Sequence, residues 1–425
     1  MENKNAEIIT IGEEYPRREA AGTAADVIAA FLCDIGIVQK SRYYVARDEE
    51  EIHAALCESM ERYDVTFITG NFVDFPVLTA NALARILGVN TVGNAPLYSC
   101  MKSYAKKHDA VLSESAQDLT IVPKGAEPLI CESVPISGYT CEKDGKLAVV
   151  LPGSPDFISL ICEQCLALFF ESYREDRTAE RKINLIGCKM PQVVAQGRIL
   201  EKKYPEVSIS ISQPTAEITF AVSVPGAGMA RASELLDKVT KDITEGELAE
   251  YVYGVDTDLQ TEIVRRLTER KQTVATAESC TGGLIAKLIT DVPGSSAVFP
   301  GGVVSYSNEI KRNFLGVKEE TLMEYGAVSH KVAIQMAEGV RHKMGANWGI
   351  GITGIAGPGG GSPEKPVGLV YLAISSRARS KVLKFNIEGN RENVRSAVAK
   401  YALRELLIRL MSSKKRRSES ASEEE

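Results

Sequence analysis

Short apolar runs alternate with helical patterns through the first third of the chain, and this alternation limits the fold more than any other feature. Apolar runs at 6–12 and 65–70 each end in glycine and predict strands. Apolar residues spaced three to four apart at 22–36 and 49–63 predict helices between them. A chain that alternates in this way forms a largely parallel sheet with helices on both faces. We therefore expect a doubly wound α/β domain over residues 1–175.

The pattern changes near residue 180. Two runs within 199–243 alternate apolar and polar residues, which predicts two strands, and an amphipathic helix follows them. We expect a small α+β linking module over residues 180–252. Strands and helices alternate again from residue 273 and end in a hairpin and a long helix at 392–411. A C-terminal α/β domain is therefore expected over residues 255–411.

Composition places the chain among globular proteins, with 44% hydrophobic and 25% charged residues. The net charge of −6, from 50 basic and 56 acidic residues, argues against a general nucleic-acid binder. No apolar run is long enough to span a bilayer, and the N-terminus lacks the layout of a secretory signal. We expect a cytoplasmic protein with no membrane or nucleic-acid partner. The tail at 412–425 joins a basic block to an acidic one and is expected to be disordered.

The nine cysteines follow no disulfide-framework spacing, which is typical of a protein from a reducing compartment. The single Cys-x-x-Cys pair, Cys162 and Cys165, lies in an apolar helical pattern and indicates a core helix rather than a zinc or redox site. The four histidines are scattered along the chain. We therefore expect no metal site built on histidine.

The stretch ESCTGG stands where a predicted strand passes into a helix. Free N–H groups and the positive end of the helix dipole face such a position, so it suits an anion or a nucleophile. The glycines Gly282 and Gly283 allow a ligand to approach the backbone closely. A simpler alternative is that Ser279 or Thr281 is only the N-cap of the helix. The stretch matches neither the nucleophile elbow nor the P-loop pattern.

A serine nucleophile needs a base, and no histidine stands in a suggestive place. Lys311 falls in the first turn of a helix that begins near Ser307 or Asn308. The helix dipole lowers the pKa of a lysine there, so a neutral amine able to deprotonate Ser279 is the hypothesis. Tyr306 would relay that proton or donate a hydrogen bond. In the alternative interpretation, Lys311 lies on a solvated face and Tyr306 is a core aromatic.

Two further features complete the candidate site. The loop GITGIAGPGGGSPEKP places Thr353 and Gly354 at the end of a strand, where they would bind substrate or donate N–H groups to an oxyanion. Without a function, it would be a flexible surface loop. Arg391 stands beside the start of the last helix, with Asn390 or Asn393 as the cap, and suits a phosphate. Together these residues indicate metal-independent acyl transfer on a phosphorylated substrate.

The motifs ESCTGG, GSSAVFPGGVVSYSNEIKRNFLGV, GAVSHKVA and GITGIAGPGGGSPEKPVGLVY resemble the C-terminal domain of the competence/damage-inducible CinA family. That domain also occurs as stand-alone nicotinamide-nucleotide amidases. The resemblance implies a homodimer that hydrolyses nicotinamide mononucleotide to nicotinic acid mononucleotide and ammonia without a cofactor. It places the nucleophile at Ser279 and the base at Lys311 with Tyr306. The adjacent Cys280 is the rival nucleophile. The expected substrate-binding residues are Cys280, Thr281, Gly282, Gly283, Thr353, Gly354 and Arg391.

The first domain resembles the family's molybdopterin-binding-like domain, which is linked to metal-dependent ADP-ribose pyrophosphatase activity. The segment LPGSPDF at 151–157 matches it. The loop ITGNFVDFPV keeps only Gly70 and Asp74, and GEEYPRREAAG replaces the acidic, leucine-rich family form. We therefore expect the fold with a degenerate, inactive site, and a divalent metal only if this domain is active. The alternatives are an active pyrophosphatase or a non-catalytic nucleotide-binding scaffold.

The middle module resembles the family's KH-like linking domain. Between residues 180 and 252 the sequence carries no Gly-x-x-Gly clamp. That clamp is the part of a KH module that grips the RNA backbone. We therefore expect no RNA binding by this module.

Overall fold

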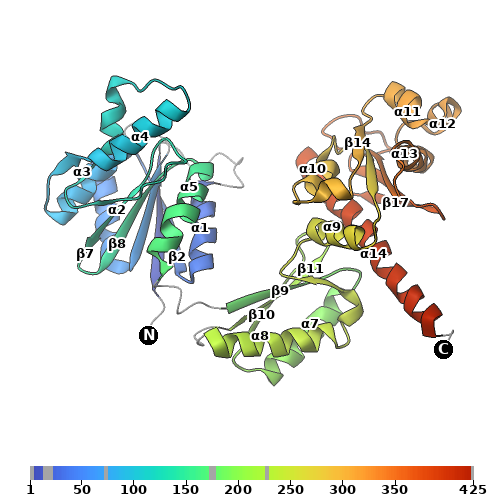
Figure 1. Ribbon diagram of the computed structural model, residues 1–425, viewed down its shortest axis with the longest axis horizontal. Coiled ribbons are helices and arrows are strands. Elements are labelled where there is room, and N and C mark those ends of the chain that lie inside the picture. Colours follow the sequence, from blue (N-terminus) through green and yellow to red (C-terminus); the bar gives the residue numbers. More distant parts are fainter. Residues whose placement is uncertain (1–3, 13–22, 71–74, 172–178, 225–228, 423–425) are drawn as a thin grey trace. The chain divides into compact units, whose positions relative to one another are not determined.

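The computed structural model describes residues 4–12, 23–70, 75–171, 179–224 and 229–422. The chain forms two compact units, one of residues 1–179 with 225–232 and the other of 180–224 with 233–425. Figure 1 draws the helices and strands of each unit. Within the described ranges, no helix is both long and apolar enough to cross a membrane.

The first unit is built on one sheet with the strand order β2-β1-β3-β8-β7-β6. These strands are β1 (Asn5–Ile11), β2 (Val38–Val45), β3 (Val65–Gly70), β6 (Glu127–Pro128), β7 (Tyr139–Lys143) and β8 (Lys146–Pro152). Strands β2, β1, β3 and β8 run parallel, and β7 and β6 extend the sheet antiparallel. The predicted doubly wound α/β fold is confirmed.

Helices cover both faces of this sheet (Figure 1). On one face α1 (Ala24–Ile35) and α5 (Pro155–Ile161) share a core with Ile8 and Phe67. On the other, α2 (Glu49–Arg62) and α3 (Phe75–Leu87) share a core with Ile9 and Ile68. Neighbouring residues of one strand point to opposite faces, so β1 and β3 each serve two cores. The remaining elements of the unit are α4 (Ala95–Lys107), η1 (Glu114–Thr120), β4 (Thr91–Gly93), β5 (Ile121–Pro123), η2 (Cys162–Leu166) and α6 (Ala167–Phe169).

The edge strand β2 is not predicted by the sequence. Its segment VQKSRYYV is rich in polar residues, and Val45 alone of its side chains is buried. An edge strand has a neighbour on one side only and tolerates charged and exposed side chains. The apolar pattern that identifies a central strand is therefore missing here.

The cysteine pair lies on the helical turn η2, directly after α5. Cys162 is buried, and burial raises the pKa of its thiol to about 12. No cluster of three or more His, Cys, Asp or Glu side chains in the described parts of the chain is arranged to hold a metal ion. The prediction that this pair belongs to a core helix is confirmed.

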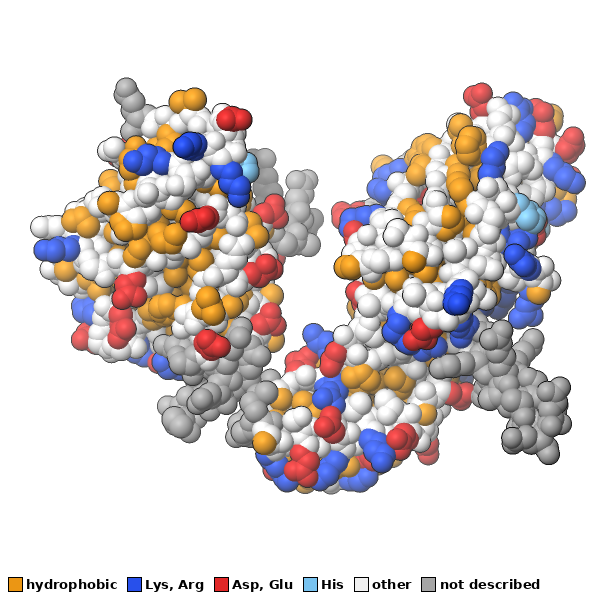
Figure 2. Space-filling model, viewed as in Figure 1, with side chains coloured by type: hydrophobic (Ala, Val, Ile, Leu, Met, Phe, Trp, Pro, Cys, Tyr) orange, Lys and Arg blue, Asp and Glu red, His pale blue; other side chains and the backbone are white. Residues whose placement is uncertain are grey.

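The middle module is a sheet of the order β10-β11-β9-β12 with helices α7 (Met190–Lys203) and α8 (Met229–Thr244). Its strands are β9 (Ala179–Leu185), β10 (Ser208–Ser212), β11 (Ile218–Val224) and β12 (Val252–Val255), the last preceded by η4 (Ala249–Tyr251). The middle module therefore has two more strands than the sequence predicts. On the face drawn in Figure 2, acidic and basic side chains are interspersed over this module, and pairs such as Lys203 with Asp242 bring them into contact.

The C-terminal sheet has the order β14-β13-β15-β16-β17. Its strands are β13 (Val274–Glu278), β14 (Gly301–Val304), β15 (Trp348–Gly354), β16 (Leu369–Ser375) and β17 (Ser380–Asn386). Strands β14, β13 and β15 are parallel, and β16 and β17 form the predicted antiparallel hairpin. The helices are α9 (Leu259–Glu269), α10 (Leu284–Thr290), η5 (Ser295–Ala297), α11 (Asn308–Leu315), α12 (Glu319–Tyr325), α13 (His330–Lys343) and α14 (Arg391–Ser422).

Helix α13 lies unusually close to β15. A β-carbon on Gly349 would stand 2.1 Å from the carbonyl oxygen of Ala337, and one on Gly351 would stand 2.4 Å from that of Ala333. These glycines are therefore required by close packing. On the opposite face, α9, α10 and α14 share one core with β13, β15 and β16.

Helix α14 extends to Ser422, past residue 411, where the sequence analysis expected a disordered tail to follow. The segment SSKKRRSESAS contains neither glycine nor proline, so no residue in it stops the helix.

Candidate active site

Three parallel strands end at one edge of the C-terminal sheet. β13 pairs with β14 on one side and β15 on the other, so their carboxyl ends lie together. Ser279 directly follows β13, Tyr306 is the second residue after β14, and Thr353 belongs to the end of β15. Ligand-binding residues of α/β sheets gather at such an edge. The order of the chain thus brings together three residues that are far apart in sequence.

The centre of the site is a contact between Lys311 and Ser279. The Lys311 Nζ lies 3.2 Å from the Ser279 Oγ, and both side chains are buried. The same Nζ donates to the carbonyl oxygens of Ser305, at 2.7 Å, and Tyr306, at 3.3 Å. The two carbonyls hold the amine against the serine. The alternative in which Lys311 lies on a solvated face is therefore wrong.

Helix α11 explains how the lysine comes to be there. Ser307 is its N-cap, and the Ser307 hydroxyl accepts from the Ile310 N–H at 3.2 Å. Lys311 falls in the first turn, as predicted, but points inward with only 1% of its surface exposed. Burial removes the ammonium group from water and lowers the pKa of Lys311 below its ordinary value. The neutral form that can accept a proton is thereby favoured.

Burial also disfavours the charged form of Cys280, but for a thiol that form is the reactive one. Its side chain belongs to the core shared by α9, α10 and α14, and burial raises the pKa of its thiol to about 12. A thiol is nucleophilic as the thiolate, which this environment disfavours. Ser279 is therefore the better placed of the two adjacent candidate nucleophiles.

The capping prediction for this stretch is wrong. The N-cap of α10 is Gly283, and neither Ser279 nor Thr281 caps it. The buried carboxylate of Glu278 instead accepts from the N–H groups of Gly283 at 3.0 Å, Ile285 at 3.2 Å and Ala286 at 2.9 Å. The expectation that these N–H groups face a ligand is wrong for the same reason, because the chain's own carboxylate occupies them.

A pocket of about 280 Å³ opens above Ser279 and Lys311. The predicted residues that line it are Ser279, Cys280, Tyr306, Lys311, Thr353, Gly354 and Arg391. The lining residues to which the sequence assigned no role in the site are Asn308, Ala327, Val328, Ile355, Ala356, Gly357, Gly359 and Gly360. Three expected residues, Thr281, Gly282 and Gly283, are not among the lining residues.

Most of these residues lie in sequence motifs that were recognised as a whole, although the individual residues were given no role in the site. Gly357 and Gly360 belong to the glycine-rich loop, and Ala327 and Val328 belong to the GAVSHKVA motif. Asn308 begins α11 beside Tyr306. The signal that would have found them is proximity to the three strand ends, which appears only after the sheet order is known.

Arg391 and Tyr306 meet at the pocket. The Arg391 guanidinium donates to the Tyr306 hydroxyl and to the Gly357 carbonyl oxygen, each at 2.9 Å. Tyr306 is 62% exposed, so the alternative that makes it a core aromatic is wrong. The Tyr306 hydroxyl accepts a hydrogen bond from Arg391, and the Tyr306 backbone carbonyl accepts one from Lys311. Asn390 is the cap at this end of α14, because its Oδ1 accepts from the Asn393 N–H at 2.9 Å.

Thr353 is buried in the wall of the pocket. Its hydroxyl donates to the Ala327 carbonyl oxygen at 2.7 Å. This bond ties the end of β15 to the segment before α13. Thr353 therefore shapes the wall as well as lining it.

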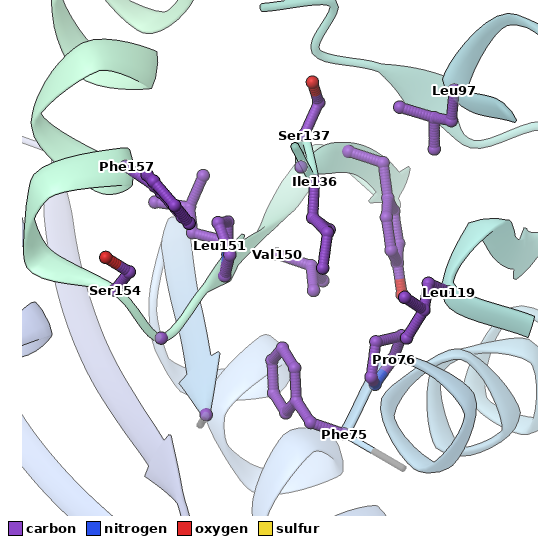
Figure 3. A pocket seen from close by; sticks show the side chains of 15 residues that line it. Phe75, Pro76, Leu97, Leu119, Ile136, Ser137, Val150, Leu151, Ser154 and Phe157 are labelled. Atoms are coloured by element: carbon purple, nitrogen blue, oxygen red, sulfur yellow. The ribbon is translucent and has the colours of Figure 1, made fainter. Parts of the chain in front are cut away.

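The first unit contains a second cavity, of about 360 Å³, at the ends of β3 and β8. Gly70, Pro152, Gly153 and Ser154 line it, and the side chains labelled in Figure 3 are apolar apart from Ser137 and Ser154. No Asp, Glu, His or Cys stands among its described lining residues. The loops containing GEEYPRREAAG and Asp74 lie outside the described residues. The segment LPGSPDF, which carries the resemblance, contributes Leu151, Pro152, Gly153, Ser154 and Phe157 to this cavity.

Comparisons with known proteins cover nearly the whole chain. The model of the CinA C-terminal domain matches residues 256–410, and that of the probable molybdopterin binding domain matches residues 7–171. A CinA-like protein of Kosmotoga olearia is 32% identical over 94% of this chain and 97% of its own length. A putative competence-damage inducible protein of Caldanaerobacter subterraneus is 34% identical over 92% of this chain and 94% of its own.

Among solved structures, the competence/damage inducible protein CihA from Agrobacterium tumefaciens is 46% identical. The match covers 36% of this chain and 96% of that protein, with a TM-score of 0.35. The two relatives above align along more than nine-tenths of both chains. The chain belongs to the CinA family.

Proposed function

We propose that the pocket hydrolyses the carboxamide of nicotinamide mononucleotide, giving nicotinic acid mononucleotide and ammonia. The observation that carries the proposal is the contact of 3.2 Å between the Lys311 Nζ and the Ser279 Oγ inside a buried site. A serine beside an amine of lowered pKa is an activated nucleophile. Membership of the CinA family supports the same reaction class.

The reaction proceeds through an acyl-enzyme. Neutral Lys311 takes the hydroxyl proton while the Ser279 oxygen attacks the carboxamide carbon. Backbone N–H groups of the pocket wall, other than the three that Glu278 occupies, stabilise the tetrahedral oxyanion in this reaction. The lysine ammonium returns its proton to the leaving nitrogen, and ammonia departs. Water, deprotonated by the same amine, then cleaves the acyl-serine and regenerates both side chains.

The surroundings of Arg391 support the proposal that the substrate carries a phosphate. Both oxygens that the structure gives it as partners, from Tyr306 and Gly357, are uncharged. No carboxylate among the described residues forms an ion pair with it, so its charge is available for a phosphate. We assign the substrate phosphate to this guanidinium at the pocket, with the nicotinamide ring directed towards Ser279.

The test of the proposal is ammonia release by the purified full chain from nicotinamide mononucleotide and, in parallel, from nicotinamide riboside. We expect release from the mononucleotide with no loss of rate when a chelator is added, and much slower release from the riboside, which lacks the phosphate. An absence of ammonia release from the mononucleotide would contradict the proposed function.

Replacing Arg391 by methionine is expected to raise the KM for the mononucleotide by roughly 10- to 100-fold, because a charge-assisted contact contributes about 1.5–3 kcal/mol. The kcat should change less than KM, since the reacting atoms are held elsewhere. Steady-state kinetics of the variant and of Arg391→Lys provide the measurement. Lysine keeps the charge without the guanidinium fork and should recover part of the affinity. An unchanged KM in the methionine variant would remove Arg391 from the binding site.

Replacing Cys280 by alanine is expected to leave ammonia release within about threefold of the wild-type rate. Its thiol is held protonated by burial, so the variant loses packing rather than a reacting group. Thermal denaturation should show a modest loss of stability, because the side chain belongs to the core. Loss of activity in a folded Cys280→Ala variant would instead support the thiol as the nucleophile.

A further inference from the structure

Glu278 is a buried carboxylate that the proposed reaction does not use. It is the last residue of β13 and has 1% of its surface exposed. Burying a carboxylate is costly unless hydrogen bonds compensate the charge. No Lys or Arg in the described ranges forms an ion pair with it. Its compensation comes from the three N–H groups at the start of α10, which also present the positive end of the helix dipole.

These three bonds close a short turn around the nucleophile. The side chain of Glu278 reaches forward to Gly283, so residues 279–282 lie between the two ends of this link. Gly282 and Gly283 adopt positive φ angles of 61° and 95°, which a closed turn of this kind requires and L side chains resist. The shape of the turn is therefore set by the Glu278 carboxylate together with two glycines.

The turn is held from two further directions. The Ser279 N–H donates to the Ile352 carbonyl oxygen at 3.1 Å, which ties the turn to β15. The Arg395 guanidinium, from α14, donates to the Thr281 carbonyl oxygen with its Nη2 at 2.9 Å and its Nε at 3.3 Å. Ser279 thus stands on a segment restrained by two strands and two helices.

We propose that Glu278 is a positioning residue, whose carboxylate fixes the turn that presents the Ser279 hydroxyl to Lys311. The inference rests on the proposed function for the identity of the substrate, but the positioning itself concerns the serine and its base. The gap of 3.2 Å between the Lys311 Nζ and the Ser279 Oγ is at the long end of a hydrogen bond. A displacement of about 1 Å at a reacting atom can lower a rate roughly 100-fold.

The test uses Glu278→Gln in the full chain. Glutamine has the same length, but its amide NH₂ takes the place of one carboxylate oxygen that accepts a hydrogen bond from a backbone N–H. At that position two donors then face each other, and the hydrogen bond is lost. The readout is covalent labelling of Ser279 by a fluorophosphonate, followed by mass spectrometry. In that reaction the serine oxygen displaces fluoride from phosphorus and its proton passes to Lys311. We expect labelling roughly 100-fold slower than in the wild type.

A matched control separates positioning from general stability. Glu262 is also a buried glutamate of this unit, and Arg265 and Arg266 of α9 hold it. Glu262→Gln should lower the denaturation temperature and leave the labelling rate of Ser279 unchanged. Ser279→Ala should give no adduct at all. In mononucleotide hydrolysis, Glu278→Gln should lower kcat roughly 100-fold and change KM less than about threefold, a division that a general loss of folded protein would not produce.

Labelling of Glu278→Gln at the wild-type rate overturns the inference. If the glutamine variant does not fold, Arg395→Met is the second test, because it removes the hydrogen bonds to the Thr281 carbonyl oxygen on the same turn. This variant should also label more slowly than the wild type. Labelling of Arg395→Met at the wild-type rate would overturn the inference. A wild-type chain that labels at Ser279 but does not hydrolyse the mononucleotide removes the proposed function alone. A wild-type chain without any adduct at Ser279 overturns both.

Discussion

The Ser279→Ala variant is expected to release ammonia from nicotinamide mononucleotide at least about 10⁴-fold more slowly than the wild type, because removing a nucleophilic serine removes the acyl-enzyme route entirely. The substitution deletes one hydroxyl at a buried position and leaves Lys311 bound to two carbonyl oxygens. The fold should therefore persist, and the KM should change little. Steady-state ammonia release and circular dichroism of the purified variant provide the measurement.

Cys280→Ala is the matched control for this experiment, since it changes the adjacent residue and is expected to keep activity. The two variants together distinguish the neighbouring nucleophiles. If Ser279→Ala released ammonia at the wild-type rate, the proposed mechanism would be wrong, whatever the behaviour of Cys280→Ala.

Replacing Lys311 by methionine is expected to lower kcat roughly 10³-fold, within the range contributed by a general base. Methionine has a similar length and no titrating group. In the wild type the rate should rise with pH as Lys311 loses its proton, with a midpoint below the ordinary lysine pKa because burial lowers it. The measurement is the pH profile of kcat/KM for both proteins. A wild-type profile that stays flat across this range would exclude Lys311 as the base.

The same variant also changes how the free energy of unfolding depends on pH. The folded pKa of Lys311 is lowered, so the unfolded chain binds its proton more tightly. Below the folded pKa this difference destabilises the fold, and the penalty fades as pH rises towards about 10.4, the ordinary lysine value. We therefore expect the stability of the wild type to rise relative to Lys311→Met over that window. Denaturant unfolding of both proteins at several pH values measures it, and a constant difference would contradict the burial of a titrating amine.

The sequence predicts the central strands of both α/β sheets and misses the edge strand β2 of the first one. β3 and β15 are largely apolar runs that end in glycine, and the range predicted for β3, 65–70, agrees with the structure. The strand β2 was not predicted, because an edge strand buries few side chains and its alternation of apolar and polar residues is weak. The weak alternation of this one strand is therefore what kept it from being predicted.

The site shows a similar division. Ser279, Lys311 and Arg391 were recognisable because each stands at the start of a helix or the end of a strand, a position that local sequence reveals. Glu278 was not, because a carboxylate that binds N–H groups five to eight residues ahead leaves no periodic pattern. The inward direction of Lys311 was likewise unreadable, since the polar sequence of α11 suggests an exposed helix.

The two carbonyl oxygens that hold Lys311 limit where its hydrogens can stand. A neutral amine carries two hydrogens and one lone pair, whereas an ammonium carries three hydrogens. With two hydrogens directed at Ser305 and Tyr306, the third tetrahedral position faces Ser279. In the proposed reaction, gain or loss of a proton is thereby confined to that position, and the direction of the hydrogen bond between Lys311 and Ser279 differs between the neutral amine and the ammonium.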